Sequence, residues 1–314
     1  MSGNRTHVVI MAGGIGSRFW PVSTPDCPKQ FIDILGCGKT LIQLTADRFE
    51  GLCPEENIWV VTNAKYVQMV KEQLPRIPDS HILAEPAARS TAPCIAWACW
   101  HISREDPDAN IVVTPSDAFV GDVCEYRRVL SNALAFTESR SAIVTVGIRP
   151  DRPETGYGYI QKGSAFDGEI CCVTAFKEKP CLETAQAYLE SGEYLWNAGI
   201  FVWNARTIAG CIRTYKPGIA EDMDRIIATG DVQGIFPQCE KISIDFAVME
   251  PAAAQGKVFT HPADFDWSDL GTWQSVYQRL PHDESGNASV CGYSVCIRDG
   301  EVSVNKRDEE QHIR

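Results

Sequence analysis

The sequence predicts an α/β protein built on a mostly parallel sheet that carries helices on both faces. In the first half of the chain, short apolar runs rich in β-branched residues alternate with longer segments of helical periodicity. Glycines and prolines close several of these runs. Alternation at this spacing is typical of a parallel sheet whose crossover helices cover both faces. The 314 residues suit one large domain of this kind or two modest ones.

Five buried strands are expected before residue 150, each followed by a turn or a helix. The run from Val8 to Ala12 is the first strand, and Thr40 is expected to cap the first helix, whose apolar face begins at Leu41. The other expected strands are 58–62, 81–84, 111–114 and 142–147. The other expected helices are 65–74, 93–103 and 124–138. Because ligands of parallel sheets bind at the carboxyl ends of the strands, we expect a site in the segments that follow them.

From Pro150 the pattern changes to shorter strands separated by turns. The Gly156–Tyr159 segment and the run 171–176 indicate antiparallel strands, followed by a helix at 182–191 and a strand at 198–203. We expect one catalytic domain over 1–280, with halves 1–149 and 150–280 and no linker between them. Residues 281–314 are expected to form a short, polar, β-rich tail with the pattern of a partial β-helix segment.

A glycine-rich turn directly follows the first strand. The sequence Gly13-Gly14-Ile15-Gly16 allows close approach to the backbone and can aim successive N–H groups at an anion. Arg18 and Lys29 add two cations in the same excursion of the chain. These features together predict a cradle for a polyphosphate. The glycines alone would also fit a tight turn without a ligand.

Two better-known phosphate-binding motifs do not fit this turn. A dinucleotide-binding GxGxxG read from Gly14 would need a glycine where Phe19 stands. A Walker loop ending at Gly38-Lys39-Thr40 would need its first glycine at Asp33. The glycine turn is therefore of another kind.

The composition narrows the class of partner. The chain has 41 acidic and 29 basic residues and a net charge of −12, which argues against a nucleic-acid-binding surface. No apolar run approaches the ~20 residues of a membrane span, and the N-terminus has no signal-peptide pattern. The 13 cysteines include no C-x-x-C pair, so neither a zinc knuckle nor a disulfide framework is indicated. A cytoplasmic location is expected.

Seven ordered blocks of this sequence resemble one protein family. GGIGSRFWP followed by PKQF is similar to the signature of the sugar-phosphate nucleotidyltransferases, and among these to the mannose-1-phosphate guanylyltransferases. The resemblance continues through EPAARSTAP, TPSD, FKEKP, WNAGIFVW, SIDFAVME and DWSDLGTW, and covers roughly residues 8–280. Two positions depart from the usual family pattern: Ser90 stands where Asn is usual, and Ala118 where His is frequent.

The resemblance implies a Rossmann-like fold of the glycosyltransferase-A type and an enzyme that makes GDP-mannose and pyrophosphate from GTP and mannose 1-phosphate. It implies catalytic roles for Arg18 and Lys29, and Mg²⁺ held by Asp117 and Asp269. The implied nucleotide-binding residues are Ala12, Gly13, Gly14, Gly16, Ser17, Arg18, Lys29, Glu85, Ser90, Thr91 and Ala92. The implied sugar-phosphate-binding residues are Gly156, Tyr157, Glu178, Lys179, Asn197 and Asp245. A homo-oligomer is a further expectation.

Several of these residues have a purely structural alternative. Asp117, Asp269, Thr91 and Asp245 could each cap a helix, and Asn197 could bond a backbone group. For the whole chain, the alternatives are the same chemistry with another base or hexose, or a non-catalytic nucleotide-sugar sensor on the same fold.

Overall fold

The structure is a computed structural model that describes residues 5–14, 17–298 and 300–306. Its main element is a mixed nine-stranded sheet of order β3-β2-β1-β4-β9-β6-β10-β8-β7. These strands are β1 (Thr6–Met11), β2 (Ile58–Asn63), β3 (Ile82–Glu85), β4 (Asn110–Pro115), β6 (Ile143–Ile148), β7 (Gly158–Asp167), β8 (Ile170–Glu178), β9 (Tyr194–Asn204) and β10 (Val258–Ala263). The expected α/β class is confirmed.

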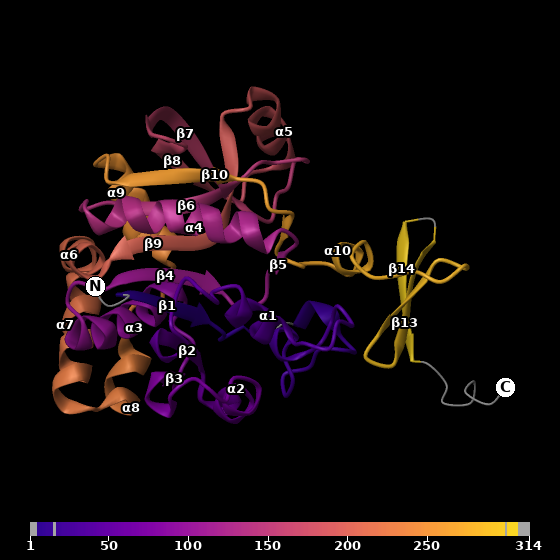
Figure 1. The fold of residues 1–314 in the computed structure, drawn as a ribbon, viewed down its shortest axis with the longest axis horizontal. Coiled ribbons are helices and arrows are strands. Elements are labelled where there is room, and N and C mark those ends of the chain that lie inside the picture. The colour runs from indigo at the N-terminus through magenta and orange to yellow at the C-terminus, as the bar shows by residue number, and fades with distance from the viewer. Residues whose placement is uncertain (1–4, 15–16, 299, 307–314) are drawn as a thin grey trace.

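Helices cover both faces of this sheet (Figure 1). They are α1 (Leu41–Asp47), α2 (Val67–Gln73), α3 (Thr91–Glu105), α4 (Val123–Glu138), α5 (Leu182–Ser191), α6 (Ala205–Tyr215), α7 (Pro217–Thr229), α8 (Val232–Ile235), α9 (Glu250–Ala254) and α10 (Trp273–Tyr277). A π-helical turn, η7 (Asp245–Met249), precedes α9. The short turns η1 (Ser17–Phe19) and η2 (Lys29–Phe31) lie in the segment between β1 and α1.

Four of the expected strands form one parallel part of the sheet, and β6 pairs in parallel with β10, a strand that is not among those expected from the sequence. β1 pairs in parallel with β2 and with β4, and β2 pairs in parallel with β3. Successive residues of these strands face opposite cores: Val9 packs against α3, whereas Val8 and Ile10 belong to the core that contains residues of α1, α2 and α4. Burial on both faces is why each strand is a continuous apolar run rather than an alternating one.

The two halves of the chain share this sheet and are not separate units. β9, from the second half, lies between β4 and β6 of the first half and pairs antiparallel with both. It begins at Tyr194, four residues before the expected start, because its first residues also pair with β7. The proposal of one domain over 1–280 without a linker therefore has the continuous sheet as its support.

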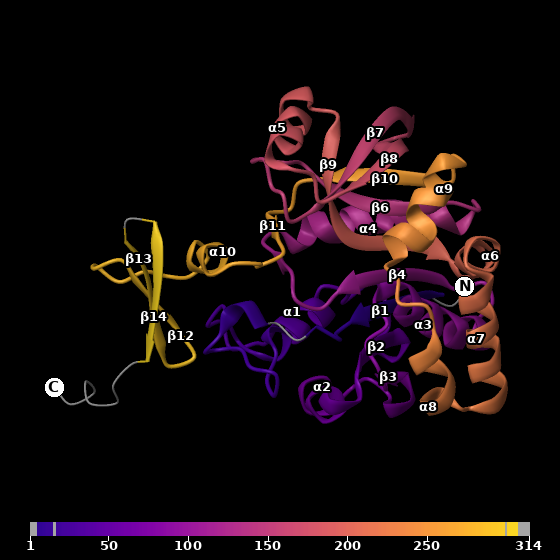
Figure 2. The same ribbon diagram turned by 180° about the vertical axis from the view of Figure 1, so that it is seen from behind.

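Beyond Leu280 the chain forms an antiparallel three-stranded sheet of β12 (Asn287–Val290), β13 (Tyr293–Arg298) and β14 (Glu301–Lys306). Antiparallel neighbours exclude the expected stacked parallel turns of a β-helix for the described part of this tail. Figures 1 and 2 show the sheet at one end of the molecule, beside α10 and the segment between β1 and α1. A third apolar cluster, which includes Phe19, Ile34, Leu270 and Val295, joins these parts. In the described residues, no helix has the length and apolar character needed to cross a membrane.

Candidate active site

The candidate site lies where several strands end at one edge of the sheet. The glycine turn follows β1, Glu85 ends β3, and Pro115-Ser116-Asp117 follows β4. The backbone N–H of Ser116 donates to the carbonyl of Met11 at 3.1 Å, which ties the β4 end to the β1 end. A Cβ placed on Gly13 would lie 3.1 Å from Oε2 of Glu85, so the glycine lets the turn lie close to that carboxyl group.

A small second sheet brings the Asp269 segment to the same place. β5 (Phe119–Val120) pairs antiparallel with β11 (Trp267–Ser268), and Ser268 lies opposite Phe119. In this register Asp269 and Ala118 follow at the same end of the pair. The two predicted metal ligands, Asp117 and Asp269, are thus brought together from positions far apart in the sequence.

Neither aspartate caps a helix, so that alternative is excluded for both. The N-cap of α4 is Asp122, whose side chain accepts from the N–H of Glu125 at 2.9 Å. The N-cap of α10 is Thr272, whose hydroxyl accepts from the N–H of Ser275. β5 lies between Asp117 and α4, and Leu270 and Gly271 lie between Asp269 and the cap of α10, so both carboxylates stand just after strand ends.

Lys29 lies between these two aspartates and is almost fully buried, with 4% of its surface exposed. Its ammonium lies 2.9 Å from Oδ2 of Asp117. It also donates to the carbonyls of Asp269 at 2.8 Å and of Leu270 at 3.1 Å. An ammonium group has three protons, so these three acceptors account for its donors. Lys29 therefore fixes the two predicted metal ligands relative to each other, and a phosphate could reach its ammonium only by displacing one of these acceptors.

The glycine turn is held from behind by a buried amide that carries no role in the sequence-based prediction. Nε2 of Gln30 donates to the carbonyl of Ala12 at 3.1 Å and to that of Gly14 at 2.8 Å. Thr62 donates a further bond to Ala12, at 2.9 Å. In a trans peptide the N–H points opposite to the C=O, so a carbonyl held toward Gln30 turns the following N–H of Gly13 away from it. Gly16 lies outside the described residues, and the structure describes only the backbone of Ser17, in η1.

Arg18 and the second half of the chain line a cavity of about 830 Å³ at this edge. Arg18 is exposed to it, while the next residue, Phe19, is buried against Trp273 at a ring-centroid distance of 5.2 Å. Tyr157 lines the same cavity and donates from its hydroxyl to Oδ1 of Asp269 at 2.5 Å. Burial and the charge of Asp269 raise the pKa of Tyr157, so its proton stays on and the hydroxyl remains a donor.

Four of the other predicted sugar-side residues form two pairs, Asn197 with Asp245 and Glu178 with Lys179. The amide of Asn197 donates to Oδ1 of Asp245 at 2.8 Å, while its own oxygen accepts from the N–H of Gly199. The hydroxyl of Thr145 donates to the same oxygen at 3.4 Å, so these three partners of Asn197 all lie within the protein. Burial, with the nearby charge of Glu178, raises the pKa of Asp245 to about 6. Lys179 is exposed and pairs with Glu178 at 3.3 Å. A Cβ on Gly158 would lie 2.8 Å from Oε2 of Glu178, so a larger residue at this position would displace that carboxylate.

Asp245 does not cap an ordinary α-helix. It opens the π-helical turn η7, and its carboxylate is taken by Asn197. Thr91 is not a cap either: it is the first residue of α3, and Ser90 is the N-cap, with a positive φ of 65°. The hydroxyl of Thr91 accepts from the N–H of Ile244 at 2.8 Å, and the N–H of Ala92 donates to the carbonyl of Ile242. These bonds join the predicted base-binding loop to the segment that carries Asp245.

Glu85 is 7% exposed and forms no ion pair with any described cation. Burial raises its pKa to about 7, and a hydrogen bond from the thiol of Cys94 only partly offsets this. A carboxyl group in such a place gains most from a ligand that supplies two N–H donors, because they would satisfy both oxygens and stabilise the charged form.

The donor set at this edge fits a divalent cation that shares its ligands with a phosphate. No group of three or more His, Cys, Asp or Glu side chains could enclose an ion among the described residues. Mg²⁺ usually takes one or two protein carboxylates and completes its octahedron with phosphate oxygens and water. Asp117 and Asp269 are two such carboxylates beside the glycine turn. Ala118 contributes no side chain to this set, but its carbonyl accepts from Nη2 of Arg48 at 2.7 Å.

Most of this chain matches one protein family. Residues 7–286 match the family described as nucleotidyl transferase. The mannose-1-phosphate guanylyltransferase of Escherichia coli K12 is 37% identical over 329 aligned positions, which cover 100% of this chain and 66% of that protein. The xanthan biosynthesis protein XanB of Xanthomonas campestris pv. campestris is 37% identical over 290 positions, covering 89% of this chain and 60% of that protein. The chain thus spans less than two thirds of the length of these relatives.

Two solved structures have the same fold as this chain. A Thermus thermophilus protein described as a mannose-1-phosphate geranyltransferase has a TM-score of 0.83 at 30% identity, over 96% of this chain and 94% of its own. A Helicobacter pylori protein described as a mannose-6-phosphate isomerase has a TM-score of 0.68 at 24% identity, over 83% of this chain and 99% of its own. At that identity, the second likeness concerns the fold alone.

Proposed function

The chain belongs to the nucleotidyl transferase family, and from that premise we propose that it transfers the guanylyl group of GTP to mannose 1-phosphate. The observation that carries the proposal is the meeting of the glycine turn, Glu85, Asp117 and Asp269 at one edge of the sheet, with Lys29 fixing the last two. The relative from Escherichia coli K12, 37% identical and named a mannose-1-phosphate guanylyltransferase, supports the choice of substrates.

In the proposed reaction, an oxygen of the sugar phosphate attacks the α-phosphorus of GTP in line with the leaving group. The bond from the α-phosphorus to the bridging oxygen of the β-phosphate breaks, and pyrophosphate leaves with the electron pair. The sugar phosphate is largely dianionic at neutral pH because its second pKa is about 6. No proton needs to be removed from it, so no general base is required.

Positioning and charge neutralisation then account for the catalysis. The N–H of Gly13 and the guanidinium of Arg18 face the space in which the β- and γ-phosphates would lie. Asp117 and Asp269 would hold a divalent cation, proposed to be Mg²⁺, which neutralises charge on the phosphate oxygens. Lys29 and Tyr157 keep these carboxylates in place through the bonds described above.

Base selection is proposed to rest on Glu85. Guanine presents two adjacent donors, the N1–H and the 2-amino group, that match the two oxygens of a carboxylate. Adenine has no such pair, and uracil has a single N–H on that edge. The sugar side is proposed to use Glu178, Asn197 and Asp245, whose oxygens accept hydrogen bonds from hydroxyl groups.

Pyrophosphate release over a grid of GTP, ATP and UTP with mannose 1-phosphate and glucose 1-phosphate tests this proposal. We expect GTP with mannose 1-phosphate to have the highest kcat/KM, and GTP to exceed UTP by about 10²-fold or more, because the wrong base leaves the buried carboxyl unpaired. Glu85→Gln should reduce the rate with GTP far more than the rate with UTP. Equal kcat/KM for GTP and UTP in the wild type would contradict the guanylyl assignment and leave nucleotidyl transfer standing.

A further inference from the structure

A second cavity, of about 510 Å³, lies beside the candidate active site and is lined by an excess of cations. It is formed where the C-terminal end of α1 meets β5 and the start of α4, and Arg279 lines both this cavity and the active-site cavity. Its charged lining residues are Lys39, Arg48, Arg127, Arg279, Asp47 and Glu50. Three of the four bases have a carboxylate partner: Lys39 pairs with Asp47 at 2.6 Å, Arg127 lies 4.0 Å from Glu50, and Arg279 pairs with Asp266 at 2.8 Å. Arg48 is the exception.

Arg48 is the buried cation of this cavity, with 4% of its surface exposed. Its guanidinium donates to the carbonyl of Ala118 at 2.7 Å and to the hydroxyl of Thr45 at 3.4 Å. Both acceptors are neutral, and no ion pair joins Arg48 to a carboxylate in the part of the chain that the structure describes. A buried charge without a counter-charge is costly. Burial lowers the pKa of Arg48 accordingly.

Arg279 has one N–H donor without an acceptor among the described residues. One end of its guanidinium donates to Asp266 at 2.8 Å, and the group lies 4.6 Å from the ring centroid of Phe119. Its Nε is buried and has no hydrogen-bond partner among the described residues. Arg127, by contrast, is used structurally: it donates to the carbonyls of Asp47 and Arg48 at the end of α1.

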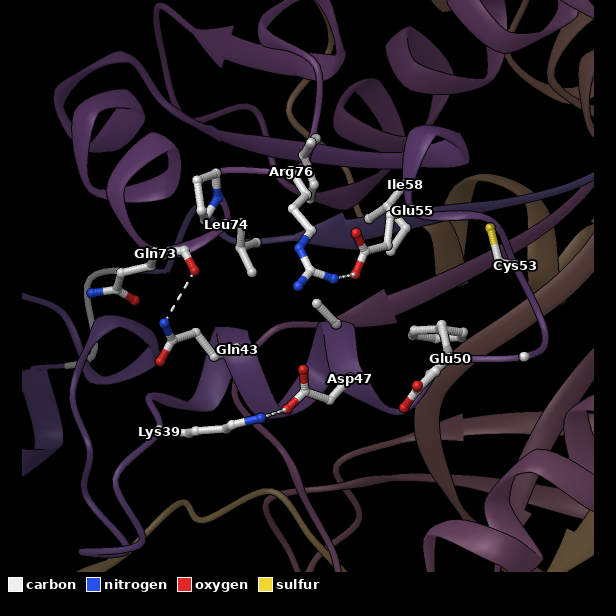
Figure 3. Close-up of a pocket in the computed structure, with 15 residues that line it drawn as sticks. Lys39, Gln43, Asp47, Glu50, Cys53, Glu55, Ile58, Gln73, Leu74 and Arg76 are labelled. Carbon is white, nitrogen blue, oxygen red and sulfur yellow. Dashed lines mark hydrogen bonds and ion pairs between the residues drawn. The ribbon is translucent and has the colours of Figure 1, made fainter.

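A cavity on the other side of α1 serves as a comparison, because its basic side chains pair with acidic ones (Figure 3). It shares Lys39, Asp47 and Glu50 with the cationic cavity, and its remaining charges are Arg76 and Glu55. Those two pair with each other at 3.0 Å, and Lys39 pairs with Asp47 at 2.6 Å. Both bases of this lining thus have a carboxylate partner, whereas Arg48 in the other cavity has none among the described residues.

We propose that the cavity at Arg48 is a second binding site, which takes a small phosphate-bearing anion. A guanidinium in a dry site binds phosphate oxygens through two parallel N–H bonds, and such charge-assisted bonds are stronger than neutral ones. The volume suits an anion between orthophosphate and a sugar phosphate in size. Arg48 also donates to the carbonyl of Ala118, the residue after Asp117. An anion bound to Arg48 would therefore affect the backbone that positions this predicted metal ligand.

Titration calorimetry with inorganic phosphate, in metal-free buffer of constant ionic strength, tests the site directly. Lys39→Met removes an exposed cation from the cavity, and Lys71→Met is its matched control. Both lysines form a 2.6 Å pair with an aspartate, but only Lys39 lines the cavity. Arg18→Gln reports on the active-site cavity in the same way.

We expect saturable binding at this cavity, separate from phosphate bound in the proposed cradle at Arg18, and Lys39→Met should weaken it about tenfold. Lys71→Met and Arg18→Gln should bind phosphate at this cavity within about twofold of the wild type. Phosphate should also raise the Tm of the wild type more than that of Lys39→Met, since a ligand stabilises the folded state it binds. Loss of binding in Arg18→Gln would place the phosphate in the active site and overturn the proposal, as would equal binding by the two lysine variants or the absence of saturable binding. None of these results depends on whether the guanylyl transfer is correct.

Discussion

The ammonium of Lys29 lies 2.9 Å from the carboxylate of Asp117 and is shielded from solvent. Its other two bonds go to the backbone of Asp269 and Leu270, and Leu270 has a positive φ of 46°. The lysine thus joins a strand end of the first half to a strained loop of the second. Its main role in this structure is to position the two aspartates.

Replacement of Lys29 by methionine should therefore reduce both turnover and stability. Removing the ammonium leaves Asp117 without its cation and two carbonyls without a donor, which we expect to cost about 2–4 kcal/mol of unfolding free energy. Turnover should fall by ~10² or more, as when one preorganised group is lost. Urea unfolding and pyrophosphate release measure the two effects.

The double variant Lys29→Met/Asp117→Asn separates them. Removing the unpaired charge of Asp117 should restore part of the lost stability without restoring turnover. Near-normal turnover in the single variant would show that Lys29 has no role in the reaction.

The two predicted metal ligands can be tested against Asp122, an aspartate near Asp117 in the sequence that caps a helix. Asp117→Asn and Asp269→Asn should each lower turnover by about 10²-fold or more and raise the Mg²⁺ concentration needed for half-maximal activity, because the amide loses the charge that holds a hard cation. Asp122 caps α4 and forms no ion pair with Lys29, so Asp122→Asn should leave both quantities unchanged and shift stability by less than about 0.5 kcal/mol. Wild-type turnover and Mg²⁺ dependence in the two site variants would exclude both aspartates as ligands.

The sequence locates the first-half strands and the residues at their ends, because buried parallel strands are apolar runs and their ends are where glycines and acids appear. It does not reveal the caps of α4 and α10, since these depend on the pairing of β5 with β11, which lie far apart in the sequence. For the same reason β9 could be recognised as a strand but not placed between β4 and β6. Gln30 lies inside the PKQF block, but the sequence does not show that its side chain bonds the carbonyls of Ala12 and Gly14. That role depends on the tertiary structure, which places η2 behind the glycine turn.

Gln30 yields a prediction of its own, because its side chain holds the glycine turn without facing the cavity. Gln30→Glu keeps the shape but replaces two N–H donors with a carboxylate that faces two carbonyl oxygens. We expect KM for GTP to rise about tenfold while KM for mannose 1-phosphate stays within about twofold, because only the phosphate cradle is disturbed. Thr62→Val removes one of the two bonds to Ala12 and should have a smaller effect in the same direction.

Gln68→Glu is the control, since it makes the same chemical change away from the glycine turn, on α2. Equal rises in KM for both substrates in Gln30→Glu would indicate a general loss of structure instead of a positioning role. Circular dichroism of each variant shows whether the fold is retained.

The pH dependence of nucleotide binding gives the last prediction, which rests on Glu85. Burial raises the pKa of this carboxyl group to about 7 in the free protein. If the charged form of Glu85 accepts the two guanine N–H donors, binding favours the deprotonated carboxylate. Below pH 7 most of the free protein carries a proton on Glu85, and that proton must be released when the ligand binds. By linkage, affinity should be constant above about pH 8 and fall as the pH drops through 7. Between pH 8 and pH 6 the ionised fraction of Glu85 falls about tenfold, so the Kd should rise about tenfold.

GDP-mannose is the suitable ligand, because its diphosphate is esterified at both ends and does not titrate in this range. Glu85→Gln should bind GDP-mannose more weakly, with a Kd that changes by no more than about twofold between pH 8 and pH 6, since Asp245, whose pKa is about 6, is half protonated at pH 6. A wild-type Kd that is equally independent of pH would rule out the ionised carboxylate of Glu85 as the group that reads the base.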